Sequence, residues 1–174
     1  MGHFLYPVHI LYPEVILVWK KIKPFIISVA ISLGVGLLSA LLTSDSMDIY
    51  SVIVQPPLAP PSILFPIVWT VLFTLMGIGA ALVYKKKDEM PKEAQDAIVV
   101  YAVNLFVNFF WSIIFFNMRA FLFAFIWILL LWAVILIMIL KFRKVSPLAA
   151  YLQIPYLIWV TFAAYLNLAI YILN

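Results

Sequence analysis

The fold is decided by the run FLFAFIWILLLWAVILIMIL at residues 121–140, which carries no charged side chain. A helix needs about 20 apolar residues to cross roughly 30 Å of hydrocarbon. Four more stretches meet this need, at 24–42, 63–83, 97–116 and 148–173. None of the five shows the sustained two-residue alternation of a membrane β-strand. The sequence therefore predicts an all-α membrane protein with a bundle of five transmembrane helices.

Composition supports this prediction, because 67% of the 174 residues are hydrophobic and only 10% are charged. Soluble domains are about 45–50% apolar. We assign residues 23–174 to one five-helix domain in contact with the lipid bilayer, and residues 1–22 to an N-terminal arm. The chain has no cysteine, which excludes disulfides, thiolate metal sites and cysteine nucleophiles.

Cations indicate the orientation of the chain. Ten of the eleven Lys and Arg residues lie before the first span, between the second and third spans, or between the fourth and fifth spans, and Arg119 is alone on the other side. The positive-inside rule makes these three regions cytoplasmic, so the N-terminus is inside and the C-terminus outside. The net charge of +4 is explained by this topology and by anionic headgroups, and not by nucleic-acid binding.

The N-terminal arm has no assigned function. Pro7 and Pro13 are expected to break any long helix there. The segment is compatible with a surface-lying arm, a poor signal sequence or an incorrectly chosen start codon. The chain's two histidines, His3 and His9, lie within it and could form only a loose metal pair, so a tail without metal is the favoured interpretation.

A proline-rich connection, QPPLAPP at residues 55–61, joins the first two spans. Two proline pairs fix φ at four positions and bias the preceding residues toward extended backbone. We therefore expect a stiff lid in front of the helix that carries Trp69. A rigid lid over this helix indicates a ligand site at one face of the bundle.

Small residues suggest how the first two spans pack. Ser28, Ser32, Gly36 and Ala40 recur every fourth residue, and Gly77 and Ala81 repeat the pattern in the second span. Such stripes let helices approach closely, within one chain or between subunits. The fourth span is bulky on all sides, and we expect it to face lipid.

The third and fifth spans each place polar and aromatic residues on one side. Tyr101, Asn104, Asn108 and Trp111 share a helical face that should point into the bundle, because unpaired amides are costly in hydrocarbon. In the fifth span Pro155 predicts a kink or a wider groove. One side of that span carries Tyr156, Trp159, Ala163, Leu166 and Asn167. Interhelical hydrogen bonds and core packing are the alternatives to a ligand site.

Three blocks in order resemble the family of tryptophan-rich sensory proteins and translocator proteins, bacterial members included. The resemblance covers about residues 23–173. Its most specific parts are Pro60-Pro61 with Phe65-Pro66-Ile67-Val68-Trp69-Thr70, then Asn108-Phe109-Phe110-Trp111-Ser112, then Pro155-Tyr156-Leu157-Ile158-Trp159-Val160-Thr161-Phe162-Ala163 with Leu166-Asn167. The resemblance implies a five-helix bundle, often a homodimer, whose pocket opens toward the loop between the first two helices.

The resemblance also implies the ligands and the pocket. Members bind porphyrins, isoquinoline carboxamides and benzodiazepines, so protoporphyrin IX and haem are the expected ligands here, with no cofactor and no metal site. The residues expected to bind the ligand are Trp69, Asn104, Asn108, Trp111, Tyr156, Trp159, Phe162 and Ala163. The residues expected to form the lid are Pro56, Pro57, Leu58, Pro60 and Pro61.

The expected function is that of a receptor-like membrane protein, placed in a prokaryotic cell membrane. The family resemblance allows light- and oxygen-dependent porphyrin degradation, with Trp69 and Trp159 as photo-oxidisable partners. The spans contain no acid–base pair or activated nucleophile for conventional catalysis. A transporter of porphyrin or another small hydrophobic solute is the alternative, and a membrane scaffold is a third possibility. The spans hold no ionisable residue of the kind transporters place at the midplane.

Two departures from the family pattern limit what can be transferred. Many relatives have tryptophan in the lid where this chain has Leu58, so one aromatic wall should be missing. Animal members carry a cholesterol-recognition pattern in the fifth helix, at positions that are Leu168 and Ile172 here. Cholesterol binding through that pattern is therefore not expected.

Overall fold

The computed structural model describes residues 11–174, with side chains from residue 15 onward, and in this range it contains helices and no strand. The elements are α1 (Leu11–Thr43), η2 (Ser44–Ser46), α2 (Ile49–Val52), α3 (Leu64–Tyr84), α4 (Pro91–Ser112), η3 (Ile113–Asn117), α5 (Phe121–Val145), α6 (Pro147–Tyr151) and α7 (Ile154–Leu173). Five helical stretches are long and apolar enough to cross a membrane. The predicted all-α fold with five membrane spans is confirmed.

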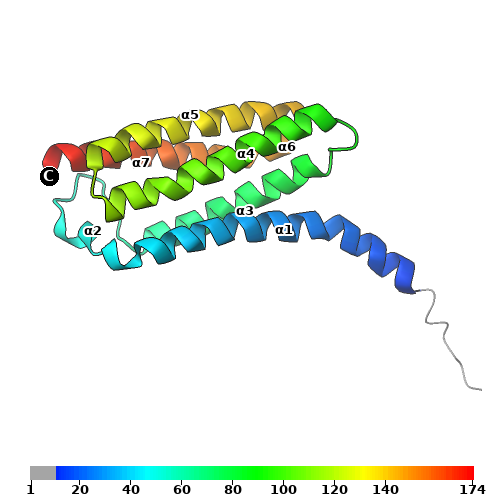
Figure 1. Ribbon diagram of the computed structural model, residues 1–174, viewed down its shortest axis with the longest axis horizontal. Coiled ribbons are helices and arrows are strands. Elements are labelled where there is room, and N and C mark those ends of the chain that lie inside the picture. Colours follow the sequence, from blue (N-terminus) through cyan, green and yellow to red (C-terminus); the bar gives the residue numbers. More distant parts are fainter. Residues whose placement is uncertain (1–10) are drawn as a thin grey trace, which may run out of the picture.

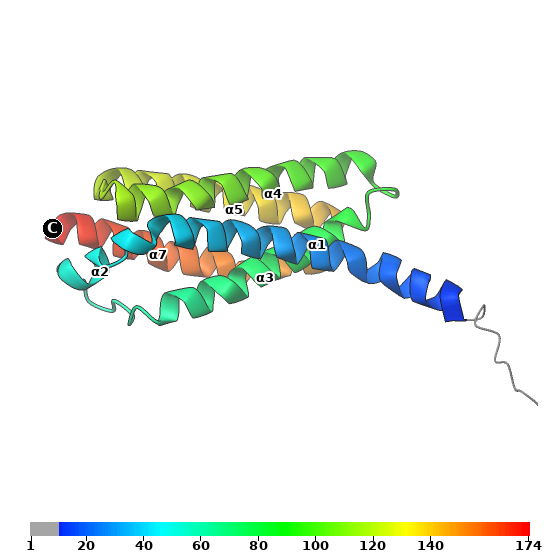
Figure 2. The same cartoon turned by 60° about the horizontal axis from the view of Figure 1, so that its bottom comes forward.

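The long helices run side by side along one axis (Figures 1 and 2). Helix α1 packs mainly against α3, and α5 packs against both α4 and α7. The α1–α3 connection and the C-terminus lie at the same end of the bundle (Figure 1). There the backbone N–H of Val54 donates to the Asn174 side-chain oxygen at 2.8 Å. The α1–α3 connection is thus hydrogen-bonded to the end of the last helix.

The small-residue stripes bring α1 and α3 into backbone contact. A Cβ built on Gly77 would lie 2.5 Å from Cα of Val29, and one built on Gly36 would lie 2.4 Å from the Phe73 ring. Ser32 belongs to the same stripe of α1. Its hydroxyl lies 2.6 Å from the hydroxyl of Tyr101 in α4, and this hydrogen bond links the two helices. The predicted close packing is confirmed, and it occurs within one chain.

The expectation that the fourth span faces lipid is wrong for one side of α5. Residues at alternating spacings of four and three are buried along this helix: Ala124, Ile128, Leu131, Ile135, Met138, Phe142 and Val145. The indole of Trp127 donates to the Val107 carbonyl, and that of Trp132 donates to the Thr161 hydroxyl, each at 2.8 Å. A lipid-facing side and a protein-facing side are equally apolar in a membrane, so composition could not separate them.

The prediction that Pro13 breaks any long helix in the N-terminal arm is also wrong, because α1 begins at Leu11 and continues through Pro13 and Pro24. Proline is tolerated in the first turn of a helix, where its missing N–H has no intrahelical partner. The interpretations based on Pro7, His3 and His9 lie outside the described residues.

Two local irregularities lie at opposite ends of the bundle, one near the α1–α3 connection and one near the lysine-bearing end. Helix α4 widens into the π-helix η3, in which the Met118 N–H donates to the Ile113 carbonyl five residues earlier. The last span is broken between α6 and α7, and Pro155 lies in the first turn of α7. The predicted disturbance at Pro155 is therefore present as a helix break. Wide π-turns of this kind are frequent at functional sites.

Candidate functional site

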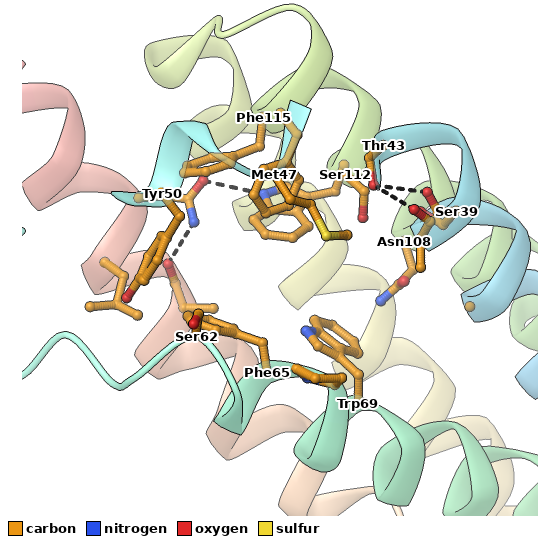
Figure 3. Close-up of a pocket in the computed structure, with 18 of the residues that line it drawn as sticks. Ser39, Thr43, Met47, Tyr50, Ser62, Phe65, Trp69, Asn108, Ser112 and Phe115 are labelled. Atoms are coloured by element: carbon orange, nitrogen blue, oxygen red, sulfur yellow. Dashed lines mark hydrogen bonds between the residues drawn. The ribbon is translucent and has the colours of Figure 1, made fainter. Parts of the chain in front are cut away.

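A cavity of about 300 Å³ lies inside the bundle, next to the α1–α3 connection. It is enclosed by α1, α3, α4 with η3, and α7. Its lining residues are Gly36, Ser39, Ala40, Thr43, Met47, Tyr50, Ser62, Phe65, Pro66, Trp69, Phe73, Asn108, Trp111, Ser112, Phe115, Phe116, Ala163, Leu166, Asn167 and Ile170. Figure 3 shows labelled members of this set arranged around an open centre.

Seven of the twenty lining residues are aromatic. The Trp69 and Trp111 rings lie 6.5 Å apart at 31°, and Trp111 stacks on Phe115 at 5.4 Å and 27°. Phe73 follows Trp69 by one helical turn, with 5.6 Å between the rings. The π-helix places Phe115 and Phe116, four and five residues after Trp111, on the cavity side together. A flat apolar molecule would find ring faces on two sides of this cavity.

Few polar groups reach the cavity, and several are already hydrogen-bonded. The Asn108 amide nitrogen donates to the Tyr156 hydroxyl at 2.8 Å. The Trp111 indole donates to the Asn167 oxygen at 3.2 Å, and Thr43 donates to the Ser39 carbonyl at 2.9 Å. These bonds hold Asn108 and Trp111 in fixed orientations, so the site is largely apolar with a few fixed polar edges.

The cavity is covered by residues between α1 and α3. Met47 and Tyr50 line the cavity from the α1–α3 connection, Met47 across the open centre from Phe65 and Trp69, and Tyr50 on the side of Ser62 (Figure 3). The Tyr50 ring meets Phe65 edge-on at 5.2 Å, and its hydroxyl donates to the Pro60 carbonyl at 2.9 Å. A tyrosine hydroxyl is already protonated at neutral pH, and partial burial raises the pKa of Tyr50 further. Tyr50 ties this cover to the proline loop.

The predicted lid residues are absent from the cavity wall. Pro56 is buried, and the Pro57 and Pro60 carbonyls accept hydrogen bonds from Tyr165 and Tyr50. Leu58 is 80% exposed and has a φ of 67°, in the left-handed region. Pro61 is exposed as well. The 55–61 loop does not line the cavity, and it contacts the cover through the hydrogen bond between Tyr50 and Pro60.

The eight residues expected to bind ligand fall into two groups. Trp69, Asn108, Trp111 and Ala163 line the cavity, and Asn104, Tyr156, Trp159 and Phe162 do not. Tyr156 is fully buried behind Asn108. Asn104 is also fully buried, and neither atom of its amide has a hydrogen-bond partner.

Trp159 and Phe162 lie outside the cavity wall. The Trp159 ring contacts Phe65 edge-on at 6.0 Å and Phe162 at 5.7 Å. Phe65 is itself part of the cavity wall, so Trp159 can influence the cavity through this ring. The predicted inward face of the third span is confirmed, because Tyr101, Asn104, Asn108 and Trp111 are all buried.

Several lining residues escaped the sequence analysis. Phe73 and Phe115 each follow a predicted tryptophan by four residues, and this spacing could have identified them. Met47 and Tyr50 carry no comparable signal, because Met47 lies in the turn after η2 and Tyr50 in the short helix α2, and the positions of both depend on the fold. Phe116 reaches the cavity through the π-helix, which the sequence pattern does not reveal.

Five membrane-length helices, four of which surround an aromatic-lined cavity, define an integral multi-pass membrane protein with an internal cavity near one end of the bundle. Comparison with known proteins gives a more specific class. The family model described as TspO/MBR matches residues 28–173, so the chain belongs to the TspO/MBR family.

Relatives come from several kingdoms. The tryptophan-rich protein TspO of Chlorobaculum tepidum is 38% identical and covers 89% of this chain and 98% of the relative. Protein CrtK of Rhodobacter capsulatus is 33% identical, and the match covers 72% of this chain and 78% of the relative. The translocator protein of Homo sapiens is 31% identical, with 83% and 85% covered. The similarity therefore extends over most of the bundle in each case.

Proposed function

We propose that this protein binds porphyrins, such as protoporphyrin IX and haem, and related flat hydrophobic molecules in the cavity between α1, α3, α4 and α7. The observation that carries the proposal is the paired ring faces of Trp69 and Trp111, extended by Phe73 and Phe115, around a largely apolar space. Stacking on such faces favours planar conjugated ligands over flexible aliphatic ones of equal size.

The size of the cavity adds a requirement. Its volume of about 300 Å³ is at the lower limit of roughly 300–1,000 Å³ that is typical of small-molecule sites. A tetrapyrrole is at the large end of such ligands, so the cover formed by Met47 and Tyr50 must move outward when it binds. The few polar edges, Asn108 and Ser112 among them, would then meet the polar rim of the ligand.

The test is a titration of the purified protein with protoporphyrin and with haem in the dark, in which tryptophan fluorescence is measured at each addition. Saturable quenching supports the proposal, and its absence contradicts it. Illumination of the complex in oxygen, with the porphyrin spectrum recorded over time, then asks whether the bound porphyrin is degraded. Porphyrin flux through sealed proteoliposomes would instead favour a transporter.

The cover gives a prediction about release rates. Tyr50→Ala removes an edge contact with Phe65 and the hydrogen bond to Pro60. We expect porphyrin to dissociate about tenfold faster, as a loss of about 1.4 kcal/mol implies. Leu58→Ala is the matched control, since Leu58 is 80% exposed and does not line the cavity. Stopped-flow release measures both rates, and equal acceleration by the two variants would contradict this role of Tyr50.

The same geometry bears on Leu58→Trp, which should tighten binding if Leu58 faces the ligand. In the structure Leu58 points to solvent from a left-handed backbone position. A tryptophan there should leave the off-rate unchanged while the loop keeps this conformation. A slower off-rate would show that the 55–61 loop turns inward when ligand binds.

We further propose that the chain lies in a prokaryotic cell membrane as a homodimer, with the lysine-bearing end inside the cell. Ten of eleven cations support this orientation. Because Asn174 lies at the opposite end, beside Val54, a reporter fused after it should be active only outside the cytoplasm. Cytoplasmic activity of that fusion would contradict the orientation, and light scattering in detergent would test the dimer.

A further inference from the structure

Helix α1 is too long for the bundle that contains it. Its 33 residues extend roughly 50 Å at about 1.5 Å per residue, whereas the hydrocarbon core is roughly 30 Å thick. The other four candidate spans have 21 to 27 residues. The N-terminal end of α1, blue in Figures 1 and 2, projects beyond the other helices and bends away from them.

The edge of the bundle is marked by Phe25. Lys85, which caps α3 at this end, places its ammonium 5.5 Å from the centre of the Phe25 ring. Pro24 and Phe25 are half-buried, whereas every residue from 15 to 23 is exposed. We name residues 15–23 the interfacial segment. It lies outside the family match, which begins at residue 28.

The interfacial segment combines two kinds of side chain. Its first five residues are apolar and between 49% and 65% exposed: Val15, Ile16, Leu17, Val18 and Trp19. Three lysines follow, at positions 20, 21 and 23. Exposure of five large apolar residues to water is unfavourable. Tryptophan and lysine are the residues that anchor helices at a membrane surface, where the ring meets the acyl boundary and the ammonium meets phosphate.

We propose that the interfacial segment bends at Pro24 and lies on the lysine-bearing membrane surface, with residues 15–19 at the acyl boundary and Lys20, Lys21 and Lys23 against the phosphates of anionic phospholipids. Pro24 lies inside the helix, so its missing N–H leaves the Lys20 carbonyl free and permits the bend. Helix α1 cannot tilt as a whole instead, because Gly77 holds α1 and α3 in backbone contact at Val29.

The absence of cysteine from the sequence makes a direct test simple, because a single spin label can be placed at will. The label goes on Leu17→Cys in the full chain, in phosphatidylcholine vesicles with and without phosphatidylglycerol. Leu37→Cys, exposed in the middle of α1, reports lipid, and Lys87→Cys, in the turn after α3, reports water. Collision with oxygen is compared with collision with a water-soluble nickel chelate.

We expect the Leu17 label to favour oxygen, as the Leu37 label does, and more strongly when phosphatidylglycerol is present. Replacing the three lysines with glutamine should remove the dependence on phosphatidylglycerol. Pro24→Ala should straighten the helix and shift the label toward the nickel preference of the Lys87 label. Binding of porphyrin should be the same in all these variants, so failure here is distinguishable from failure of the proposed cavity function.

Three results would overturn the proposal. Preference for nickel with Pro24 intact in phosphatidylglycerol vesicles would place the interfacial segment in water. Protection from both reagents together with spin–spin broadening would show that a second copy of the chain covers it. An unchanged oxygen preference in Pro24→Ala would show that the segment does not depend on a bend at this proline.

Discussion

Gly77→Ala should destabilise the bundle more than any other single methyl group added to its glycines. The new Cβ would lie 2.5 Å from Cα and 2.7 Å from the backbone nitrogen of Val29, and 2.8 Å from the Ser28 carbonyl oxygen. Backbone atoms of a packed helix cannot rotate away as a side chain can. Helices α1 and α3 must therefore separate along their contact, and overpacking of this kind costs about 1–3 kcal/mol or more.

The matched control is Gly34→Ala in α1, where the added Cβ would meet nothing within 4 Å. Alanine is a better helix former than glycine by about 0.5–1 kcal/mol, so this variant should be neutral or slightly stabilised. Thermal unfolding in detergent would compare the two. Similar melting temperatures for both variants would show that α1 and α3 do not pack as closely as the structure indicates.

The second large effect is expected at Trp69. This ring faces the cavity and lies near Trp111, Phe73 and Tyr156. If it supplies a stacking face to a porphyrin, Trp69→Ala should weaken binding by about 1–3 kcal/mol, or roughly 5- to 150-fold in Kd, by analogy with base–aromatic stacking. The measurement is a fluorescence or absorbance titration with protoporphyrin.

Trp159→Ala separates direct contact from support. Trp159 does not line the cavity and contacts the wall residue Phe65, so its loss should weaken binding less than the loss of Trp69. Trp19→Ala is the negative control, because Trp19 lies on the interfacial segment. Trp127 is unsuitable for this purpose, since its indole bonds to the Val107 carbonyl. Equal losses in Trp69→Ala and Trp19→Ala would indicate general destabilisation instead of ligand contact.

The fold was predictable because a membrane restricts the possible structures. Backbone groups in hydrocarbon must be paired within the segment, so each apolar run of sufficient length becomes a helix. The small residues around Gly36 and Gly77 also predicted close packing, which the structure assigns to α1 and α3. The face of α5 was not predictable, because its buried and lipid-facing residues have the same composition.

Half of the eight residues predicted to bind ligand line the cavity. Trp69, Asn108, Trp111 and Ala163 share the cavity, as helical spacing and the family resemblance led us to expect. Trp159 was placed with them by its side of the fifth span and by the family resemblance, and Phe162 by the resemblance alone. The Trp159 ring instead contacts Phe65, and the Phe162 ring contacts Trp159, since the rotation of α7 and the position of α3 decide which ring reaches the centre.

By itself the sequence determined the number of spans, the inward face of α4 and the aromatic character of the site, because hydropathy and helical periodicity are properties of one segment at a time. Only the tertiary structure decided that Met47 and Tyr50 cover the cavity, and that Leu58 faces solvent. It also placed Phe116 in the wall through a π-helix, and set the edge of the bundle at Phe25. These features depend on contacts between segments that are far apart in the sequence. The residue pattern of one segment does not reveal which other segments it will contact.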